Sequence, residues 1–177
     1  RNVMKTVIRR ATQEDVAHIG AINSAVFLGD RKEGEGAVSW VQCWFNAFPL
    51  YQYFVVEEAG VIVGYAGWQL HGGFHRAEPV IELDQIGVLP ANQGKGLAPK
   101  LIQHCMQELL EWAKEHNDRI ESHLTFVVWA YALNFNAVSV YAKYFTDGVS
   151  GLRTQFGARA ENMLRVRIPI VRPVREE

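Results

Sequence analysis

Gln93-Gly94-Lys95-Gly96-Leu97-Ala98 lies between a segment rich in β-formers and an amphipathic helix. The segment before it has apolar residues at positions 81, 83, 86 and 88 and stops at Pro90, as a strand does. The apolar residues after it recur at helical spacing, at Leu97, Leu101, Ile102, Cys105, Leu109 and Trp112. The sequence therefore predicts a strand, a glycine-rich turn and a helix in succession.

This order of elements is typical of a site for a phosphate group. Glycines let the main chain approach a ligand without a Cβ in the way. The first turn of the following helix leaves N–H groups unpaired and directs the positive end of its dipole at the turn. The segment is therefore expected to hold an anion such as a pyrophosphate by main-chain groups.

Two common phosphate-binding motifs do not fit the spacing. A P-loop has a glycine five residues before its Gly-Lys pair and a hydroxyl residue after it, but Leu89 and Gly96 stand at these two positions. A dinucleotide-binding fingerprint has Gly or Ala three residues after its second glycine, where this chain has Pro99. The sequence thus disfavours ATP, GTP and NAD as ligands.

The segment 93–98 resembles the acyl-CoA loop of the GNAT acetyltransferase superfamily, written Gln/Arg-x-x-Gly-x-Gly/Ala. The residues before it, 86–90, are similar to the fourth strand of that family. A second stretch, Asn134-Phe135-Asn136-Ala137-Val138-Ser139-Val140-Tyr141-Ala142-Lys143, resembles the family's last helix, in which Asn is followed by Ala and Tyr at three and seven residues. A long helix to about residue 116 and a strand from about 124 to 129 are expected between the two motifs.

The resemblance implies a GNAT fold, of α/β class with a mixed sheet of about six or seven strands and about four flanking helices. The chain is expected to form a single domain over residues 4–177. Strands are predicted at 6–9, 53–57, 61–70, 81–88, 124–129 and 164–168, with helices after Thr12 and around Trp40 to Phe48. A polar loop is expected from Gly29 to Gly36, and a longer loop from Tyr144 through Gly151.

Composition limits the partners. The chain has 177 residues, 49% of them hydrophobic and 21% charged, and a formal net charge of −1. No basic field therefore favours nucleic acid or an anionic membrane. Cys43 and Cys105 have no paired spacing, and no signal peptide or long apolar run is visible, so a cytoplasmic protein without disulfides is expected, as a monomer or homodimer.

By the resemblance, backbone groups of the fourth strand hold the acyl group and pantetheine arm of acetyl-CoA, and the glycine-rich loop holds its pyrophosphate. Asn134 would bind the CoA arm, although an Asn at a helix start is also a common cap. The cofactor-binding residues implied are Ile86, Gly87, Val88, Gln93, Gly94, Lys95, Gly96, Leu97, Ala98 and Asn134.

The expected reaction, transfer of an acetyl group to a primary amine, calls for a base and an acid. Glu82 stands six residues before Val88, where some family members carry a glutamate, and Asp84 shares its strand face by alternation. The alternative is that both are solvated strand carboxylates or neighbours in an ion pair, and that a water relay takes the role of the base. Tyr141 matches the family tyrosine that lies near the CoA sulfur, or it is a packing residue.

No metal is expected, because His71 and His75 have no third ligand spaced with them. The function that the sequence favours is an N-acetyltransferase that uses acetyl-CoA by direct attack in a ternary complex, with an unidentified amine acceptor. An acyl-CoA-binding sensor without turnover is the alternative from another class. A nucleotide-binding domain of a different fold is the third.

Overall fold

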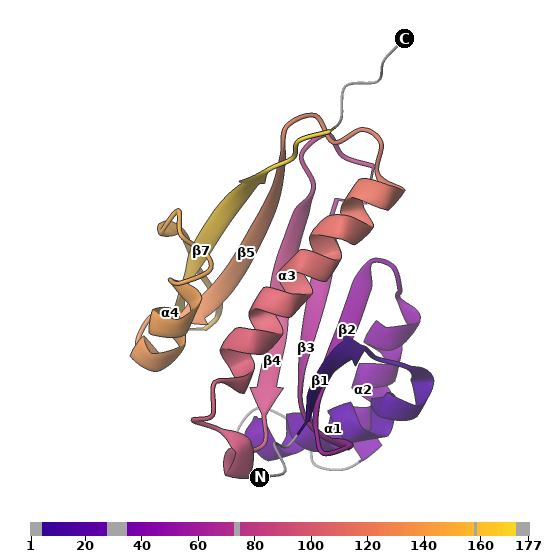
Figure 1. Cartoon of the computed structure of the whole chain (residues 1–177). Coiled ribbons are helices and arrows are strands. Elements are labelled where there is room, and N and C mark those ends of the chain that lie inside the picture. The colour runs from indigo at the N-terminus through magenta and orange to yellow at the C-terminus, as the bar shows by residue number, and fades with distance from the viewer. Residues whose placement is uncertain (1–4, 28–34, 73–74, 158, 173–177) are drawn as a thin grey trace. The chain divides into compact units, whose positions relative to one another are not determined.

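The computed structural model describes residues 5–27, 35–72, 75–157 and 159–172. In this part of the chain seven strands and four α-helices follow one another as shown in Figure 1. Their order is β1 (Thr6–Arg10), η1 (Gln13–Asp15), α1 (Val16–Val26), α2 (Glu35–Asn46), β2 (Tyr51–Glu58), β3 (Val61–His71), β4 (Val80–Val88), η2 (Pro90–Asn92), α3 (Leu97–His116), β5 (His123–Tyr131), α4 (Phe135–Tyr141), β6 (Val149–Phe156) and β7 (Arg159–Pro169).

The strands belong to one hydrogen-bonded sheet in the order β1-β2-β3-β4-β5-β7-β6. β1 and β2, β2 and β3, β5 and β7, and β6 and β7 pair antiparallel. This mixed sheet with its helices confirms the predicted fold class. Among the described residues, no helix is both long and apolar enough to span a membrane.

The chain divides into two compact units, which are described separately below. The first unit comprises residues up to Gln69 together with Leu83–Gln107, and the second comprises Leu70–Glu82 and Glu108 onward. The single domain over residues 4–177 stays a prediction.

An aromatic core holds α1 and α2 against the sheet of the first unit. Apolar residues at helical spacing on α1 meet alternate residues of β2 and β3, because each strand directs every second side chain to one face. The buried members of this core are Val16, Ile19, Ile22, Val41, Tyr51, Tyr53, Val55 and Tyr65. Trp44 covers it from α2, with its ring centroid 4.5 Å from that of Tyr51.

The start of α1 differs in detail from the prediction. Thr12 caps a single 3₁₀ turn, η1, and the α-helix begins only at Val16. The backbone N–H of Thr12 donates to Asp15 Oδ2 at 2.7 Å, which closes a capping box. Arg9 reaches the same oxygen at 2.6 Å, so β1 and the helix start are tied together.

The second unit contains one strand that the sequence did not indicate. Residues 149–151, predicted to lie in a loop, belong to β6, which pairs with β7 at the edge of the sheet. Most β6 side chains are exposed, so the strand lacks the apolar alternation that marks a half-buried strand. Backbone pairing with β7 holds the strand in place instead. Its side-chain pattern gives little indication of a strand.

The other predicted elements agree with the structure to within a few residues. α2 ends at Asn46, so Phe48 lies beyond the helix and is 56% exposed. Ala59 and Gly60 both have positive φ angles, 51° and 80°, and form the predicted turn between β2 and β3. Of the polar loop 29–36, residues 29–34 lie outside the described residues, and 35 and 36 belong to α2.

Candidate active site

The glycine-rich loop lies in the first unit, between η2 and the start of α3. Gly94 and Gly96 both have φ of 77°, a conformation that side-chain-bearing residues rarely adopt. A Cβ built on either glycine would have no atom within 4 Å, and both residues are exposed. The main chain of the loop is therefore open to a ligand on the side where a side chain would stand.

Contacts of polar side chains fix this loop to its surroundings. Gln93 Nε2 donates to the main-chain oxygen of Val88, the last residue of β4, at 2.9 Å. Glu58 at the end of β2 accepts from Asn92 Nδ2 at 3.0 Å and lies 3.7 Å from Lys95 Nζ. The turn is thus preorganised by contacts within the first unit. Gln93 and Lys95 have structural partners here, beside the cofactor contacts predicted for them.

The first turn of α3 follows the loop directly. Leu97 is 3% exposed and anchors the helix start in the core. Lys100 N–H donates to Gly96 O at 3.3 Å, the first bond of the helical ladder. The N–H groups of Leu97 and Ala98 precede that ladder, so helix geometry gives them no intrahelical acceptor. Pro99 has no N–H, which suits a position in the first turn.

The end of β4 is fixed against β3. Leu89 N–H donates to Val63 O at 2.8 Å. A Cβ on Gly87 would lie 3.2 Å from Tyr65 Cε1 and 3.5 Å from Val26 Cγ2, so glycine lets the core close over the strand. Val88 is buried and Ile86 half-buried. The three residues predicted to hold the acyl group therefore continue directly into the loop that Gln93 closes.

Glu82 lies in the second unit, where it is 7% exposed. Its Oε1 is 3.2 Å from Nε2 of His71, whose side chain is 44% exposed. The contact between the buried carboxylate and the exposed imidazole orients the ring of His71. The pair can accept a proton at the imidazole and stabilise the resulting charge.

Asp84, in the first unit, is exposed and has a different set of partners. Tyr51 Oη donates to Asp84 Oδ2 at 2.7 Å, and Gln85 Nε2 lies 3.3 Å from the same oxygen. Burial, together with the nearby Asp84 charge, raises the pKa of Tyr51 well above its usual range. Tyr51 therefore stays protonated and remains a donor to Asp84.

Asn134 and Tyr141 lie at the two ends of α4 in the second unit. Asn134 Oδ1 accepts from Ala137 N–H at 3.2 Å, so this side chain caps the helix as a capping Asn does. Burial raises the pKa of Tyr141 to about 12. Its ring packs edge-on to Phe145, with centroids 6.2 Å apart. The phenol is therefore protonated throughout the neutral range.

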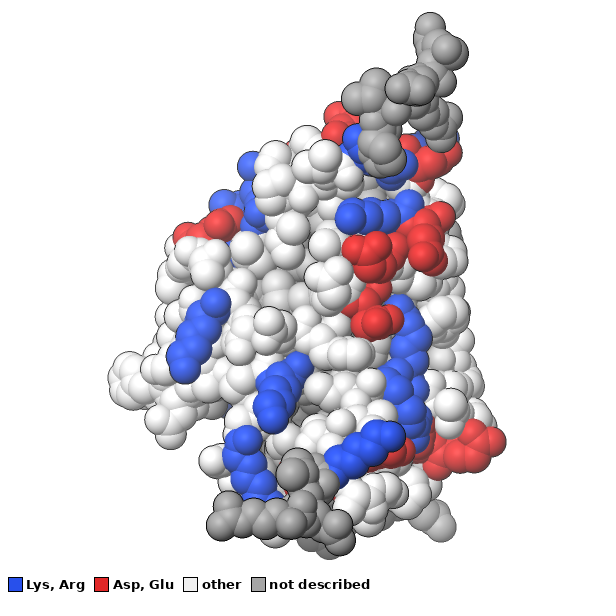
Figure 2. All heavy atoms as spheres, in the orientation of Figure 1, with Lys and Arg blue, Asp and Glu red and all other residues white. Residues whose placement is uncertain are grey.

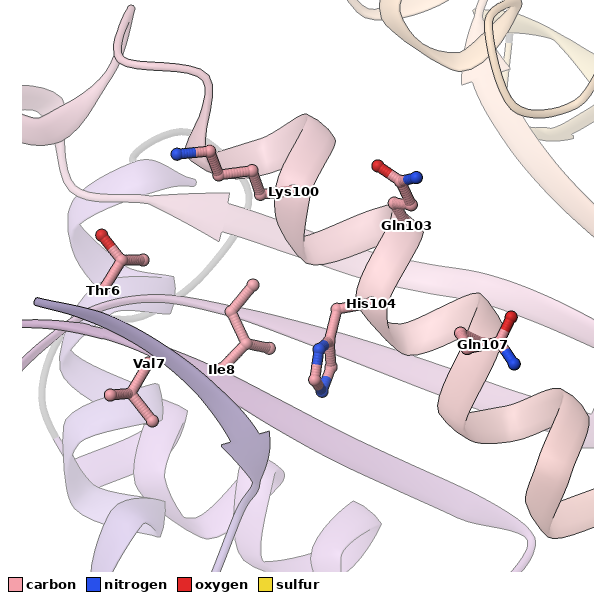
Figure 3. Close-up of a pocket in the computed structure, with 7 residues that line it drawn as sticks. All are labelled: Thr6, Val7, Ile8, Lys100, Gln103, His104 and Gln107. Atoms are coloured by element: carbon pink, nitrogen blue, oxygen red, sulfur yellow. The ribbon is translucent and has the colours of Figure 1, made fainter.

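An open groove of about 790 Å³ runs between β1 and the first half of α3. Thr6, Val7 and Ile8 line it from β1, and Lys100, Gln103, His104 and Gln107 line it from the helix (Figure 3). None of the predicted site residues is among them. The groove and the glycine-rich loop share α3 but use different parts of it.

On the face drawn in Figure 2, lysines and arginines are interspersed with acidic and uncharged residues. Across the described residues, no group of three His, Cys, Asp or Glu side chains is arranged to hold a metal ion.

Sequence reasoning missed four contributors to these sites: Glu58, Tyr51, Gln85 and His71 as a partner of Glu82. Each acts through a contact with a residue that is distant in the chain. Tyr51 and Asp84, for example, are 33 positions apart. No local pattern in the sequence signals such contacts.

Comparison with known proteins decides the family. The family model described as "Acetyltransferase (GNAT) family" matches residues 19–145, well over half of the chain. The chain belongs to the GNAT family of acetyltransferases. A search of curated proteins finds no match.

Solved GNAT structures share its fold at low sequence identity. The ribosomal-protein-S18-alanine N-acetyltransferase of Escherichia coli is 18% identical, with a TM-score of 0.65 and coverage of 94% of this chain and 96% of that one. The yncA protein of Salmonella typhimurium, solved with its cofactor acetyl-CoA, is 24% identical, with a TM-score of 0.63 and coverage of 92% and 93%. Arabidopsis thaliana Naa50, in complex with the bisubstrate analogue CoA-Ac-MVNAL, is 12% identical, with a TM-score of 0.63 and coverage of 91% and 97%.

Proposed function

We propose that this GNAT acetyltransferase transfers the acetyl group of acetyl-CoA to a primary amine by direct attack in a ternary complex. The observation that carries the proposal is the exposed main chain of Gly94 and Gly96, which opens directly onto the first turn of α3. The chain fits the cosubstrate there, because a pyrophosphate needs several N–H donors and close approach to the backbone. The acetyl-CoA and CoA named in the structures of its relatives support the same choice.

The residues before and in the loop would then bind different parts of the cosubstrate. The N–H groups of residues 94–98 bind the pyrophosphate, and main-chain groups of Ile86, Gly87 and Val88 bind the pantetheine arm and the thioester carbonyl. The Asn134 side chain already uses its oxygen in the helix cap, so its amide nitrogen is the group that would donate to the CoA arm.

Glu82 and His71 would supply the base. An alkyl amine with a pKa of about 10.4 is neutral in only about one molecule in 2,500 at pH 7, so deprotonation costs roughly 4 to 5 kcal/mol. Glu82 is buried and His71 is exposed, so the acceptor proton passes to Glu82 directly or through the imidazole. The ammonium ion gives one proton to this pair before attack. The new C–N bond then forms as the C–S bond breaks, and the nitrogen loses its second proton to solvent.

Tyr141 would act on the leaving thiolate. A phenol with a pKa of about 12 is a weaker acid than a thiol near 8.5, so full proton transfer to the sulfur is unfavourable by roughly 5 kcal/mol. Hydrogen-bond donation to the sulfur as its charge develops requires no such transfer. The tyrosine therefore stabilises the departing thiolate, which solvent then protonates.

The acceptor belongs to one of several amine classes, because acceptor contacts come from loops that no motif fixes. We propose one catalytic domain over residues 4–177, acting in the cytoplasm as a monomer or homodimer. Neither nucleic acid nor a membrane surface is a partner that its net charge of −1 favours.

An amine panel tests the function. Benzylamine, 1,4-diaminobutane, lysine amide and a peptide with N-terminal alanine are each incubated with acetyl-CoA and the protein, and release of the CoA thiol is followed. The proposal predicts amine-dependent thiol release and an acetylated amine by mass spectrometry. Acetyl-CoA binding without turnover on any panel amine would favour a sensor instead, and competition by ATP but not by CoA would favour a nucleotide-binding domain.

A further inference from the structure

A continuous chain of hydrogen bonds in the first unit ends at the exposed carboxylate of Asp84. It begins on α1, where Asn23 Nδ2 donates to Tyr65 Oη at 2.7 Å. Tyr65 Oη donates to Gln85 Oε1 at 3.2 Å, and Gln85 Nε2 donates to Tyr51 Oη. Tyr51 Oη donates to Asp84 Oδ2 at 2.7 Å. The four residues before Asp84 are at most 5% exposed.

The hydrogen bonds of this series run in one consistent direction from donor to acceptor. Because the side-chain oxygen of Gln85 accepts from Tyr65, its amide nitrogen faces Tyr51. The oxygen of Tyr51 therefore accepts a bond, and its own proton is directed at the carboxylate of Asp84. Each buried polar group in this series has a partner, and the series holds one oxygen of Asp84 in place.

The backbone makes room for the contact. Tyr51 on β2 reaches Asp84 on β4 by crossing β3 at Gly67. A Cβ on Gly67 would lie 2.8 Å from Tyr51 Cε1 and 2.9 Å from Cζ, so any side chain there would displace the ring. Trp44 covers the other side of the ring, with centroids 4.5 Å apart.

Folding stability alone does not account for a buried polar network of this kind. Replacing both partners of a buried hydrogen bond with apolar groups of the same shape can leave stability nearly unchanged. The distinct result of such a network is a fixed geometry. Here that geometry orients the carboxylate of Asp84, an exposed residue.

We propose that Asp84 binds the positive charge of the acceptor amine, and that Tyr51 is the positioning residue that holds Asp84 for this contact. This inference rests on the proposed N-acetyltransfer. Alkyl amines carry a positive charge at pH 7, and an oriented carboxylate binds them as a charge-assisted hydrogen-bond acceptor. The site thus selects acceptors that arrive as ammonium ions over neutral aryl amines.

The test is a double-mutant cycle on the KM for the most active amine of the panel, with aniline, which is neutral at pH 7, as a comparison substrate or competitive inhibitor. Asp84→Asn should raise the KM for the protonated amine by roughly 10-fold to 100-fold and change the KM or inhibition constant for aniline by less than about threefold. Tyr51→Phe should raise the same KM by roughly 3-fold to 10-fold in the parent protein and leave it unchanged in the Asp84→Asn background.

Tyr53→Phe is the matched control, since it removes an equally buried hydroxyl that accepts from Gln85 at 3.2 Å. This variant should keep the parent KM within about twofold. Thermal unfolding of each variant checks the fold, and Asp84→Asn, at an exposed position, tests the carboxylate even where Tyr51→Phe is unstable.

An unchanged KM in Asp84→Asn, or an equal effect of Tyr51→Phe in both backgrounds, would overturn the inference while leaving the proposed reaction in place. A parent protein that acetylates no amine of the panel would overturn the reaction and the inference together.

Discussion

The side-chain amide of Gln93 donates a hydrogen bond of 2.9 Å to the main-chain oxygen of Val88. This bond closes the loop between the end of β4 and the start of α3, and so fixes the N–H groups of Gly94 and Gly96 relative to the strand. The loop is preorganised before a ligand arrives, which lowers the entropy cost of binding.

Gln93→Ala should therefore weaken CoA binding by roughly 5-fold to 20-fold, through the loss of one hydrogen bond and of loop order. Isothermal titration calorimetry with CoA measures this change in affinity. Gln103→Ala, at an exposed position on α3, is the control and should bind CoA as the parent does. Equal affinities for Gln93→Ala and the control would show that the bond to Val88 has no part in the site.

Glu82→Gln should lower turnover mainly at neutral pH and recover toward the parent at high pH. General bases contribute about 100-fold to 10,000-fold, and the help is needed only while the amine is protonated, below its pKa of about 10.4. The measurement is kcat from pH 6.5 to 10 on the best panel amine. Glu78→Gln, at an exposed position next to Arg167, serves as the carboxylate control. A ratio that does not change with pH would assign the base to another group.

Tyr141→Phe should reduce kcat by roughly 10-fold to 1,000-fold with acyl-CoA affinity within a few-fold of the parent. The variant keeps the ring against Phe145 and deletes only the donor. The loss should be smaller for an acyl donor with a more acidic thiol, because a better leaving group needs less stabilisation. Tyr131→Phe is the control. Full activity in a folded Tyr141→Phe protein would leave the tyrosine as a packing residue.

Asp15 makes part of the stability of the first unit dependent on pH. Burial acts to raise the pKa of Asp15, but the hydrogen bonds from Arg9 and Thr12 outweigh it and lower the pKa below its usual value. A carboxyl whose folded pKa is depressed contributes stability above its unfolded pKa of about 3.9, and that contribution is lost as pH falls through the folded pKa.

Asp15→Asn should therefore reduce the free energy of unfolding by roughly 1 to 3 kcal/mol at pH 7, and the difference should shrink below about pH 4. Urea unfolding at pH 7 and pH 3 measures this difference in the free energy of unfolding. Glu111→Gln, on the exposed side of α3, should have little effect at either pH. A difference between Asp15→Asn and the parent that is the same at both pH values would contradict the ion-pair explanation.

The sequence predicted the parts of this fold that local patterns encode. The alternation around Leu83, the helical repeat from Leu97 and the glycine pair at Gly94 and Gly96 indicate their own secondary structure, and the family resemblance supplied their order. The local sequence pattern did not indicate β6, because the exposed side chains of this strand show no apolar alternation.

The candidate site was predictable to the same extent. Gly94 and Gly96 adopt the open conformation that their position implied, and Asn134 begins its helix. The partners that orient the carboxylates were not predictable, because Tyr51 meets Asp84 and His71 meets Glu82 only through pairing of strands. Long-range contacts of this kind follow from the register of the sheet, which one sequence does not determine.

Binding of CoA to the Gly96→Asp variant is the most direct test of the acyl-CoA site. Asp at this position adds a side chain and a negative charge to the open side of the loop, where the pyrophosphate would lie. Gly157→Asp is the matched control, because Gly157 also has a positive φ, 69°, with no atom within 4 Å of a built Cβ. By isothermal calorimetry, we expect CoA affinity to fall by at least about 100-fold in Gly96→Asp and to stay near the parent value in Gly157→Asp. Unchanged CoA binding in a folded Gly96→Asp protein would contradict the account.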